Sequence, residues 1–248
     1  MVRNIKLKIA YDGTNYHGWQ TQLNGATIQE TIENAIFIIM KQKVDLIGSG
    51  RTDSGVHAYG QVANFIVDTT IPEDKVKVAL NSILPLDIRI IDSEDVSLDF
   101  NSRFDACDKT YMYQIYNDRV WDPFFTRYSC FVPVGLDFEK MGNSVKSLMG
   151  THDFLGFMAS GSQVKTTVRT IFDVNLVKED KLFKLYITGN GFLYNMVRII
   201  SGTLIDIGKG VKNIDAFENA IISKDRTMLG KTAEPQGLFL MNVNYKKV

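Results

Sequence analysis

Cysteine, proline and long apolar segments are all scarce in this chain. Its 248 residues include two cysteines, five prolines and three histidines. Cys107 and Cys130 have neither the spacing of a disulfide framework nor that of a metal site, so we expect a reducing, cytoplasmic location. The longest apolar run, residues 192–208, contains Arg198 and Asp206 and is too short to span a bilayer comfortably. These absences argue against a disulfide-rich secreted protein and against a membrane protein.

Net charge is also absent, because 28 Lys and Arg residues balance 28 Asp and Glu residues. Residues 1–105 hold 10 basic and 14 acidic residues, a net of −4, and residues 106–248 hold 18 and 14, a net of +4. Charge alone therefore gives little support to a nucleic-acid-binding protein. Any RNA-binding surface has to be a local basic patch.

The first part of the chain has the pattern of a small α+β unit. Residues 5–9 alternate apolar and charged side chains, which predicts a half-buried strand, and Thr27 to Glu30 form a capping box that opens a helix. Further strands are predicted at 44–47, 61–67 and 88–91, with a helix after Pro72. The predicted order is β-α-β-β-α-β.

The second part repeats this order more loosely, without a sequence repeat. Strands are predicted at 109–117, 171–177, 182–188 and 238–245, and helices after Asp137, at 194–207 and at 214–222. We therefore predict an α+β fold of two ferredoxin-like halves, 1–102 and 103–248. Their sheets are expected to join into one mixed, mainly antiparallel sheet.

Between two apolar runs lies the glycine-rich segment GSGRTDSGVH, residues 48–57. Its spacing fits neither a dinucleotide-binding nor a P-loop motif, and a strand rather than a helix follows it. Asp53, Ser54 and His57 are residue types of a hydrolase triad, but triad members normally come from separate segments. The three histidines lack metal-ligand spacing. From the loop alone, Asp53 is either a functional carboxylate or a residue that caps its own turn.

A family resemblance favours the functional carboxylate. GSGRTDSGVHAYGQVANF (48–65) resembles the signature G-R-T-D-x-G-V-H-A of the TruA family of tRNA pseudouridine synthases. Other stretches resemble the family in the same order: YDGTNYHGWQ (11–20), RFDACDKTYMYQI (103–115), GSQVKTTVRTI (161–171), GFLYNMVRIISGTLIDIG (191–208) and PQGLFL (235–240). The departures are small: Lys109, Ser54 and Thr21 stand where the family often has arginine, alanine and arginine.

The resemblance implies isomerisation of uridine to pseudouridine in the anticodon arm of tRNA, at positions 38, 39 and 40. It implies no cofactor and no metal. Asp53 matches the catalytic aspartate, and Arg198 the arginine expected to pair with it. An arginine within an apolar helix face fits such a pairing, because an unpaired buried charge is costly. Tyr111 matches the tyrosine that stacks on the uracil, and Leu238 is expected to line the base pocket.

RNA contacts are expected from five basic residues: Arg51, Arg103, Lys109, Lys165 and Arg169. Arg51 is placed to fill the position that an extruded uridine vacates, and the other four are candidates for phosphate contacts. Bacterial members of the family act as homodimers, so we expect a homodimer that binds tRNA. Two alternatives stay open: a pseudouridine synthase acting on other RNA positions, and a non-catalytic RNA-binding or chaperone protein.

Overall fold

A computed structural model describes residues 1–161 and 164–246, and the chain divides into two compact units. The first contains residues 1–107 together with the segment from Phe239 onward, and the second contains residues 108–238. The sequence placed the division five residues earlier, after residue 102. It also assigned the C-terminal strand to the second half, whereas that strand packs with the first unit.

In the first unit, four strands form a sheet in the order β4-β1-β3-β10, and a short β2 pairs with β3. The strands are β1 (Val2–Tyr11), β2 (Ile47–Gly48), β3 (His57–Asp68), β4 (Ile88–Val96) and β10 (Leu238–Tyr245). β1 pairs antiparallel with β3 and β4, while β10 runs parallel to β3. This strand order explains why β10 belongs to the first unit although it is last in the chain.

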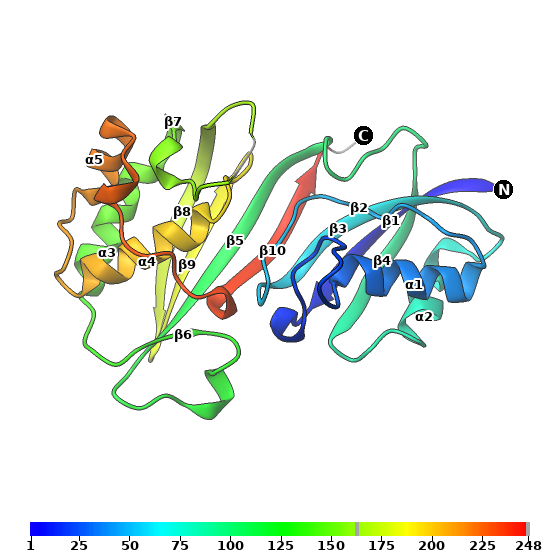
Figure 1. The fold of residues 1–248 in the computed structure, drawn as a ribbon, viewed down its shortest axis with the longest axis horizontal. Helices are drawn as coiled ribbons and strands as arrows, with labels where there is room; N and C mark the ends of the chain where they lie inside the picture. The colour runs from blue at the N-terminus through cyan, green and yellow to red at the C-terminus, as the bar shows by residue number, and fades with distance from the viewer. Residues whose placement is uncertain (162–163, 247–248) are drawn as a thin grey trace. The chain divides into compact units, whose positions relative to one another are not determined.

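Helices α1 (Ile28–Met40) and α2 (Glu73–Asn81) lie side by side in the first unit (Figure 1). The predicted cap is present, because Thr27 Oγ1 accepts a hydrogen bond from the Glu30 N–H at 3.4 Å. One row of apolar side chains on β1 and one on α1 is fully buried: Ile5, Leu7, Ile9, Ile28, Ile32 and Ile36. The core of the unit therefore lies where the alternating and helical patterns predict it.

In the second unit, four strands form an antiparallel set in the order β5-β9-β8-β7, and β6 runs parallel to β5. The strands are β5 (Ala106–Asn117), β6 (Cys130–Val132), β7 (Gly150–Asp153), β8 (Val168–Glu179) and β9 (Leu182–Gly189). The helices are α3 (Phe138–Ser144), α4 (Met196–Gly208) and α5 (Ala216–Ser223). The strands predicted at 171–177 and 182–188 are present as β8 and β9, which pair antiparallel. The short strands β6 and β7 were not predicted.

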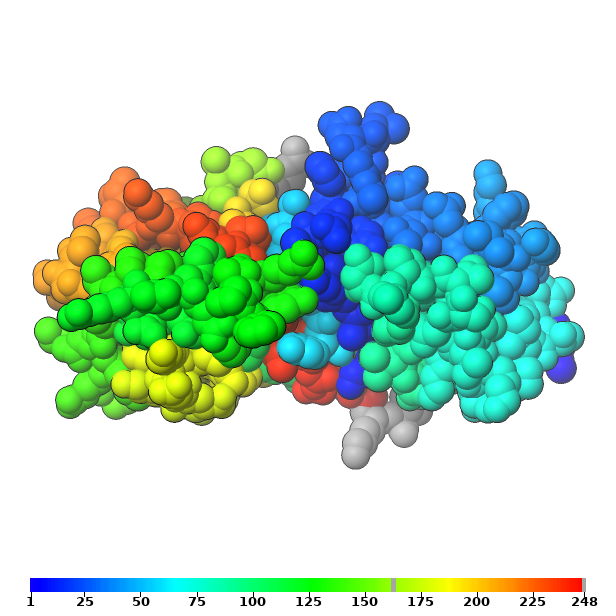
Figure 2. All heavy atoms as spheres, turned by 90° about the horizontal axis from the view of Figure 1, so that it is seen from below, coloured from blue at the N-terminus to red at the C-terminus, as the bar shows by residue number. Residues whose placement is uncertain are grey.

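In the part of the chain that the structure describes there are also six short 3-10 helices: Gly13–Asn15, Pro123–Phe125, Val145–Leu148, Leu155–Phe157, Arg226–Met228 and Pro235–Gly237. The second of them lies in the connection between β5 and β6, which is green and at the surface in Figure 2. The fold class is confirmed as α+β with a mixed, mainly antiparallel arrangement of strands. Among the described residues, no helix is long and apolar enough to cross a membrane.

Candidate active site

The predicted catalytic residue Asp53 lies in the loop between β2 and β3. Its side chain is half-buried, while Arg51 and Ser54 on either side are exposed. Thr52 and Val56, by contrast, are buried and anchor the loop. The Asp53 carboxylate therefore lies near the surface, while the buried residues Thr52 and Val56 hold the backbone on either side of it.

Thr52, next to Asp53, is held by the N-terminal motif 11–20. Its carbonyl oxygen accepts a hydrogen bond from the Trp19 N–H at 3.0 Å, and its hydroxyl lies 2.8 Å from the Tyr11 hydroxyl. Burial raises the pKa of Tyr11, because the charged phenolate would be desolvated there. The Trp19 carbonyl in turn accepts from the Gln29 N–H at 3.0 Å in the first turn of α1. A continuous hydrogen-bonded path therefore joins α1 to the residue before Asp53.

Two glycines of the same motif let the chain approach the Asp53 loop closely. A Cβ atom on Gly13 would lie 2.0 Å from the Val56 carbonyl oxygen. A Cβ atom on Gly18 would lie 2.5 Å from the Thr52 carbonyl oxygen, and Gly18 has a φ of +87°, which favours glycine. No side chain fits at either position without moving the backbone around Asp53.

The other side of the loop is fixed by buried polar groups. The Ser49 hydroxyl donates to Gln61 Oε1 at 2.7 Å, and Gln61 Nε2 donates to the Gly50 carbonyl oxygen at 2.9 Å. At the end of the loop, His57 is buried, and its Nδ1 accepts from the Gly13 N–H at 3.1 Å. Since buried polar groups that lack partners are costly, these bonds give the loop one preferred conformation. His57 therefore has a structural part in the loop, and the triad interpretation gains no support.

Tyr111, the predicted base-stacking residue, lies on β5 in the second unit and is 8% exposed. Phe192 packs against it edge to face, with ring centroids 5.1 Å apart. Such a contact fixes the plane of the tyrosine ring. Leu238, at the start of β10, is also buried, as expected for a residue that lines a pocket or a core.

Arg198 lies in the first turn of α4 and is half-buried. Its Nε donates to the Ala233 carbonyl oxygen at 2.8 Å, and an Nη nitrogen donates to Asn195 Oδ1 at 2.8 Å. The Ala233 N–H donates back to the Arg198 carbonyl oxygen at 3.0 Å. Gly202, one turn further along α4, permits this approach, because a Cβ there would lie 1.8 Å from the Lys231 carbonyl oxygen. The helix and the segment 231–233 together hold the guanidinium.

The five predicted RNA contacts differ in their surroundings. Arg51, Arg103 and Lys165 are exposed, and the Arg103 guanidinium lies 5.6 Å from the centre of the exposed Phe104 ring. Lys109 is half-buried on β5. Arg169 donates to the carbonyl oxygens of Thr166 and Val168 at 2.9 and 2.6 Å, and burial lowers its pKa. Arg169 therefore also braces the start of β8. Ser162 and Gln163 of the motif 161–171 lie outside the described residues.

Sequence reasoning missed the residues that position the predicted ones. Asp53 belongs to the first unit, and Tyr111 and Arg198 belong to the second. The pairing of Arg198 with Asp53 therefore stays a prediction. Tyr11, Gly13, Gly18, Phe192 and Asn195 were not singled out, although all five fall within the quoted motifs 11–20 and 191–208. For Tyr11, Gly13, Gly18 and Phe192, position within a motif was the only signal, because their contacts join segments far apart in sequence. Asn195 lies only three residues before Arg198, but no helical pattern predicts their hydrogen bond.

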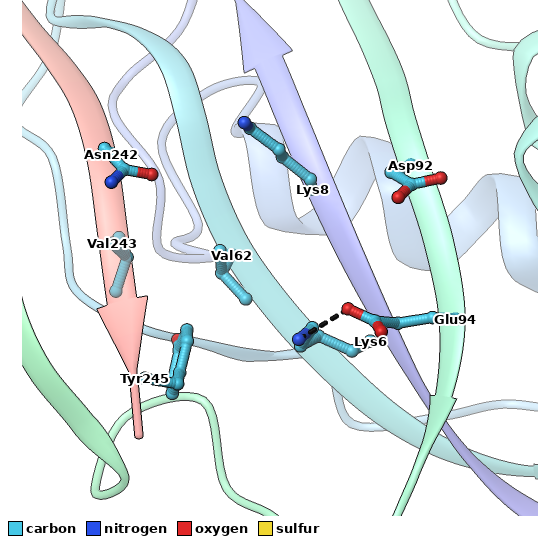
Figure 3. A pocket seen from close by; sticks show the side chains of 8 residues that line it. All are labelled: Lys6, Lys8, Val62, Asp92, Glu94, Asn242, Val243 and Tyr245. Carbon is cyan, nitrogen blue, oxygen red and sulfur yellow. Dashed lines mark ion pairs between the residues drawn. The ribbon is translucent and has the colours of Figure 1, made fainter. Parts of the chain in front are cut away.

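A hollow of about 180 Å³ lies on the first unit's sheet face opposite Ile5, Leu7 and Ile9 (Figure 3). Its lining comes from β1, β3, β4 and β10: Lys6, Lys8, Val62, Asp92, Glu94, Asn242, Val243 and Tyr245. Lys6 forms an ion pair with Glu94 at 2.5 Å. The hollow contains none of the predicted site residues, so we do not assign it to the reaction. Within residues 1–161 and 164–246, no group of three His, Cys, Asp or Glu side chains is placed to hold a metal ion.

Comparison with known proteins agrees with the motifs. A family model described as tRNA pseudouridine synthase matches residues 8–105 and 145–246. The chain is 51% identical over 244 residues to tRNA pseudouridine synthase A of Acetivibrio thermocellus, covering 98% of this chain and 100% of that protein. It is 48% identical over 247 residues to tRNA pseudouridine synthase A 2 of Clostridium tetani, covering 99% and 100%. The chain therefore belongs to the tRNA pseudouridine synthase family.

Among solved structures, the chain resembles one titled as a Cbf5-Nop10-Gar1 complex. The sequence identity is 12%, the TM-score is 0.38, and the match covers 96% of this chain and 58% of that one. This likeness is too distant to support an argument about the site. The family assignment rests on the sequence relatives.

Proposed function

We propose that this protein converts uridine to pseudouridine in tRNA, with Asp53 as the catalytic carboxylate. The observation that carries the proposal is the match to the family over most of the chain, including the loop that holds Asp53. The fixed backbone on both sides of Asp53 supports a positioned catalytic group, because catalysis requires reacting groups in defined geometry.

The reaction is an isomerisation that balances without an oxidant or a reductant. The bond between ribose C1′ and uracil N1 breaks, the base turns, and a bond between C1′ and C5 forms. The proton leaves C5, and N1 ends protonated. A carboxylate beside the sugar serves either as a nucleophile or as a base in such a sequence.

The remaining roles follow from the family motifs. Tyr111 stacks on the uracil while the base is detached, and Leu238 lines the pocket. Arg198 pairs with the catalytic carboxylate, because an arginine among the buried residues of α4 calls for a partner of opposite charge. The burial of Tyr111 and Leu238 and the hydrogen bonds that hold Arg198 support these assignments.

The substrate positions are 38, 39 and 40 of the anticodon arm, as in the family. A uridine in a stem has to leave the base stack before it reaches Asp53. The exposed Arg51, two residues before Asp53, contacts the RNA at the vacated position. Arg103, Lys109, Lys165 and Arg169 contact phosphates.

The protein acts in the cytoplasm as a homodimer. A protomer with a formal net charge of zero has a weak electrostatic hold on tRNA, and two copies provide a larger surface. Light scattering at micromolar concentration is expected to give a mass near twice the 28.0 kDa of one chain. A mass near that of one chain contradicts the dimer.

Tritium release tests the activity directly. tRNA labelled with tritium at uridine C5 loses its label as pseudouridine forms, and mapping of the product tRNA identifies the modified positions. Release confined to positions 38, 39 and 40 is the expected result. Binding of tRNA without release would instead indicate a non-catalytic RNA-binding protein, and release from other positions a different specificity.

A further inference from the structure

Asn195, the residue that begins helix α4, has an unusual conformation for its position. Its φ is 60° and its ψ is 8°, in the left-handed region, whereas the residue before a helix is normally extended. Its side chain makes no capping hydrogen bond to the first turn. Asparagine is among the few residues with a side chain that tolerate this conformation, although glycine adopts it more readily. Helix capping therefore does not explain why an asparagine stands here.

The Asn195 side chain instead accepts a hydrogen bond from Arg198. Its Oδ1 lies 2.8 Å from an Nη nitrogen of the guanidinium, and the Nε of the same group donates to the Ala233 carbonyl oxygen. Because the guanidinium is planar, acceptors at two of its nitrogens fix both its plane and the direction of its third nitrogen. Both acceptors belong to the second unit, as Arg198 does.

We propose that Asn195 is a positioning residue, which orients the Arg198 guanidinium for the reaction. This inference rests on the proposed function, in which Arg198 pairs with the catalytic carboxylate. An arginine side chain has several rotatable bonds, and each rotamer points the charge elsewhere. The Asn195 amide selects one orientation of the guanidinium. In return, the helix has no side-chain cap, and Asn195 adopts a left-handed backbone conformation.

The variant Asn195→Gly separates the side chain from the backbone. Glycine keeps the left-handed conformation without strain and removes the side chain that carries the acceptor. With enzyme in excess over labelled tRNA, we expect the rate of tritium release at saturation to fall about ten- to a hundredfold. The enzyme concentration at half-saturation is expected to stay within about threefold, because Asn195 acts on the chemical step. A rate within about twofold of the unmodified protein overturns the proposal.

Asp180→Gly is the matched control. Asp180 has a φ of 52° and is exposed in the turn between β8 and β9 of the same unit. The change therefore replaces a left-handed residue by glycine without touching Arg198, and the rate is expected to stay within about twofold. Thermal unfolding of both variants completes the comparison. If Asn195→Gly lowers Tm so far that the variant is partly unfolded in the assay, and this accounts for the loss of rate, Asn195 is a structural residue and the proposal fails.

A double-mutant cycle with Arg198→Lys tests the route of the effect. Lysine keeps the charge but lacks the planar group that Asn195 orients. If Asn195 acts through Arg198, adding Asn195→Gly to Arg198→Lys lowers the rate by less than about twofold further. If the two losses multiply, Asn195 acts independently and the proposal is overturned. Absence of tritium release from the unmodified protein would instead refute the proposed function itself.

Discussion

The loop of Asp53 and the start of helix α4 both hold a predicted active-site residue, but by different means. The loop is held mainly through its backbone: carbonyl oxygens of Thr52 and Gly50 accept hydrogen bonds, and glycines 13 and 18 touch its main chain. Arg198 is held through its side chain, by the Asn195 amide and the Ala233 carbonyl oxygen.

The difference predicts different responses to substitution. A backbone held by close contact tolerates no added atoms, so changes around the loop affect folding as well as activity. A side chain held by hydrogen bonds loses its orientation when one acceptor is removed, while the helix beneath it stays folded. Changes at the carboxylate itself leave the backbone contacts of the loop in place and therefore report on chemistry rather than on folding.

Asp53→Asn is expected to have the largest effect on activity. Asparagine has nearly the same volume and is a comparable turn residue, so the loop keeps its conformation. It lacks the negative charge and the nucleophilic or basic oxygen. We expect turnover to fall below detection, by a factor of about a thousand or more. The measurement is tritium release from labelled tRNA.

Circular dichroism and filter binding on the same preparation provide the controls for Asp53→Asn. Folding and tRNA affinity are expected to stay close to those of the unmodified protein, and affinity rises slightly if a negative charge facing the RNA is removed. A folded, tRNA-binding variant with activity within about tenfold of the unmodified protein would sink the catalytic assignment.

Gly13→Ala tests the backbone support of the loop. The new methyl group would lie 2.0 Å from the Val56 carbonyl oxygen, so the main chain has to move. Overpacking of this kind costs about 3 kcal/mol, which corresponds to a decrease in Tm of roughly 6–12 °C for a chain of this length. Thermal unfolding measures the change. An unaltered Tm would show that the loop is not clamped at this position.

Structural elements that are encoded by the pattern of neighbouring residues could be predicted from the sequence. The alternation in β1 and the Thr27 cap of α1 both depend on neighbouring residues, and both are present. Strands β6 and β7 have only three and four residues, so they lack a periodic pattern of their own. They exist because β5 and β8 offer them partners.

The same distinction holds for the candidate site. Asp53 and Arg198 stand in motifs that a family resemblance identifies, but most of their supports come from segments far away in the sequence, such as the Ala233 carbonyl oxygen that holds Arg198. Gly13 meets Val56, which is 43 residues further along the chain. The left-handed backbone conformation of Asn195 cannot be predicted from the sequence, because asparagine permits this conformation but does not require it.

Arg51→Ala compares an exposed side chain of the Asp53 loop with the buried residues that support the same loop. Arg51 is exposed, and Thr52, next to it, is buried, so removal of the arginine side chain leaves the supports of the loop intact. If Arg51 fills the position of the extruded uridine, modification of structured tRNA falls about tenfold more than modification of an already unpaired uridine. Parallel tritium-release assays on the two substrates measure the ratio. Equal losses on both would assign Arg51 to chemistry or to folding instead.

Gly142→Ala makes the same substitution as Gly13→Ala at a glycine where the added methyl group has free space. Gly142 lies within α3, and a Cβ there would meet no atom within 4 Å. Alanine loses less conformational freedom than glycine when a helix forms, so the change stabilises the protein by about 0.5–1 kcal/mol. We expect Tm to rise by roughly 1–4 °C with tritium release unchanged. Because the same substitution at Gly13 is expected to lower Tm, the pair separates the close approach at the loop from the general effect of replacing glycine by alanine. A decrease in Tm at both positions would remove the evidence that the backbone contact at Gly13 is special to the Asp53 loop.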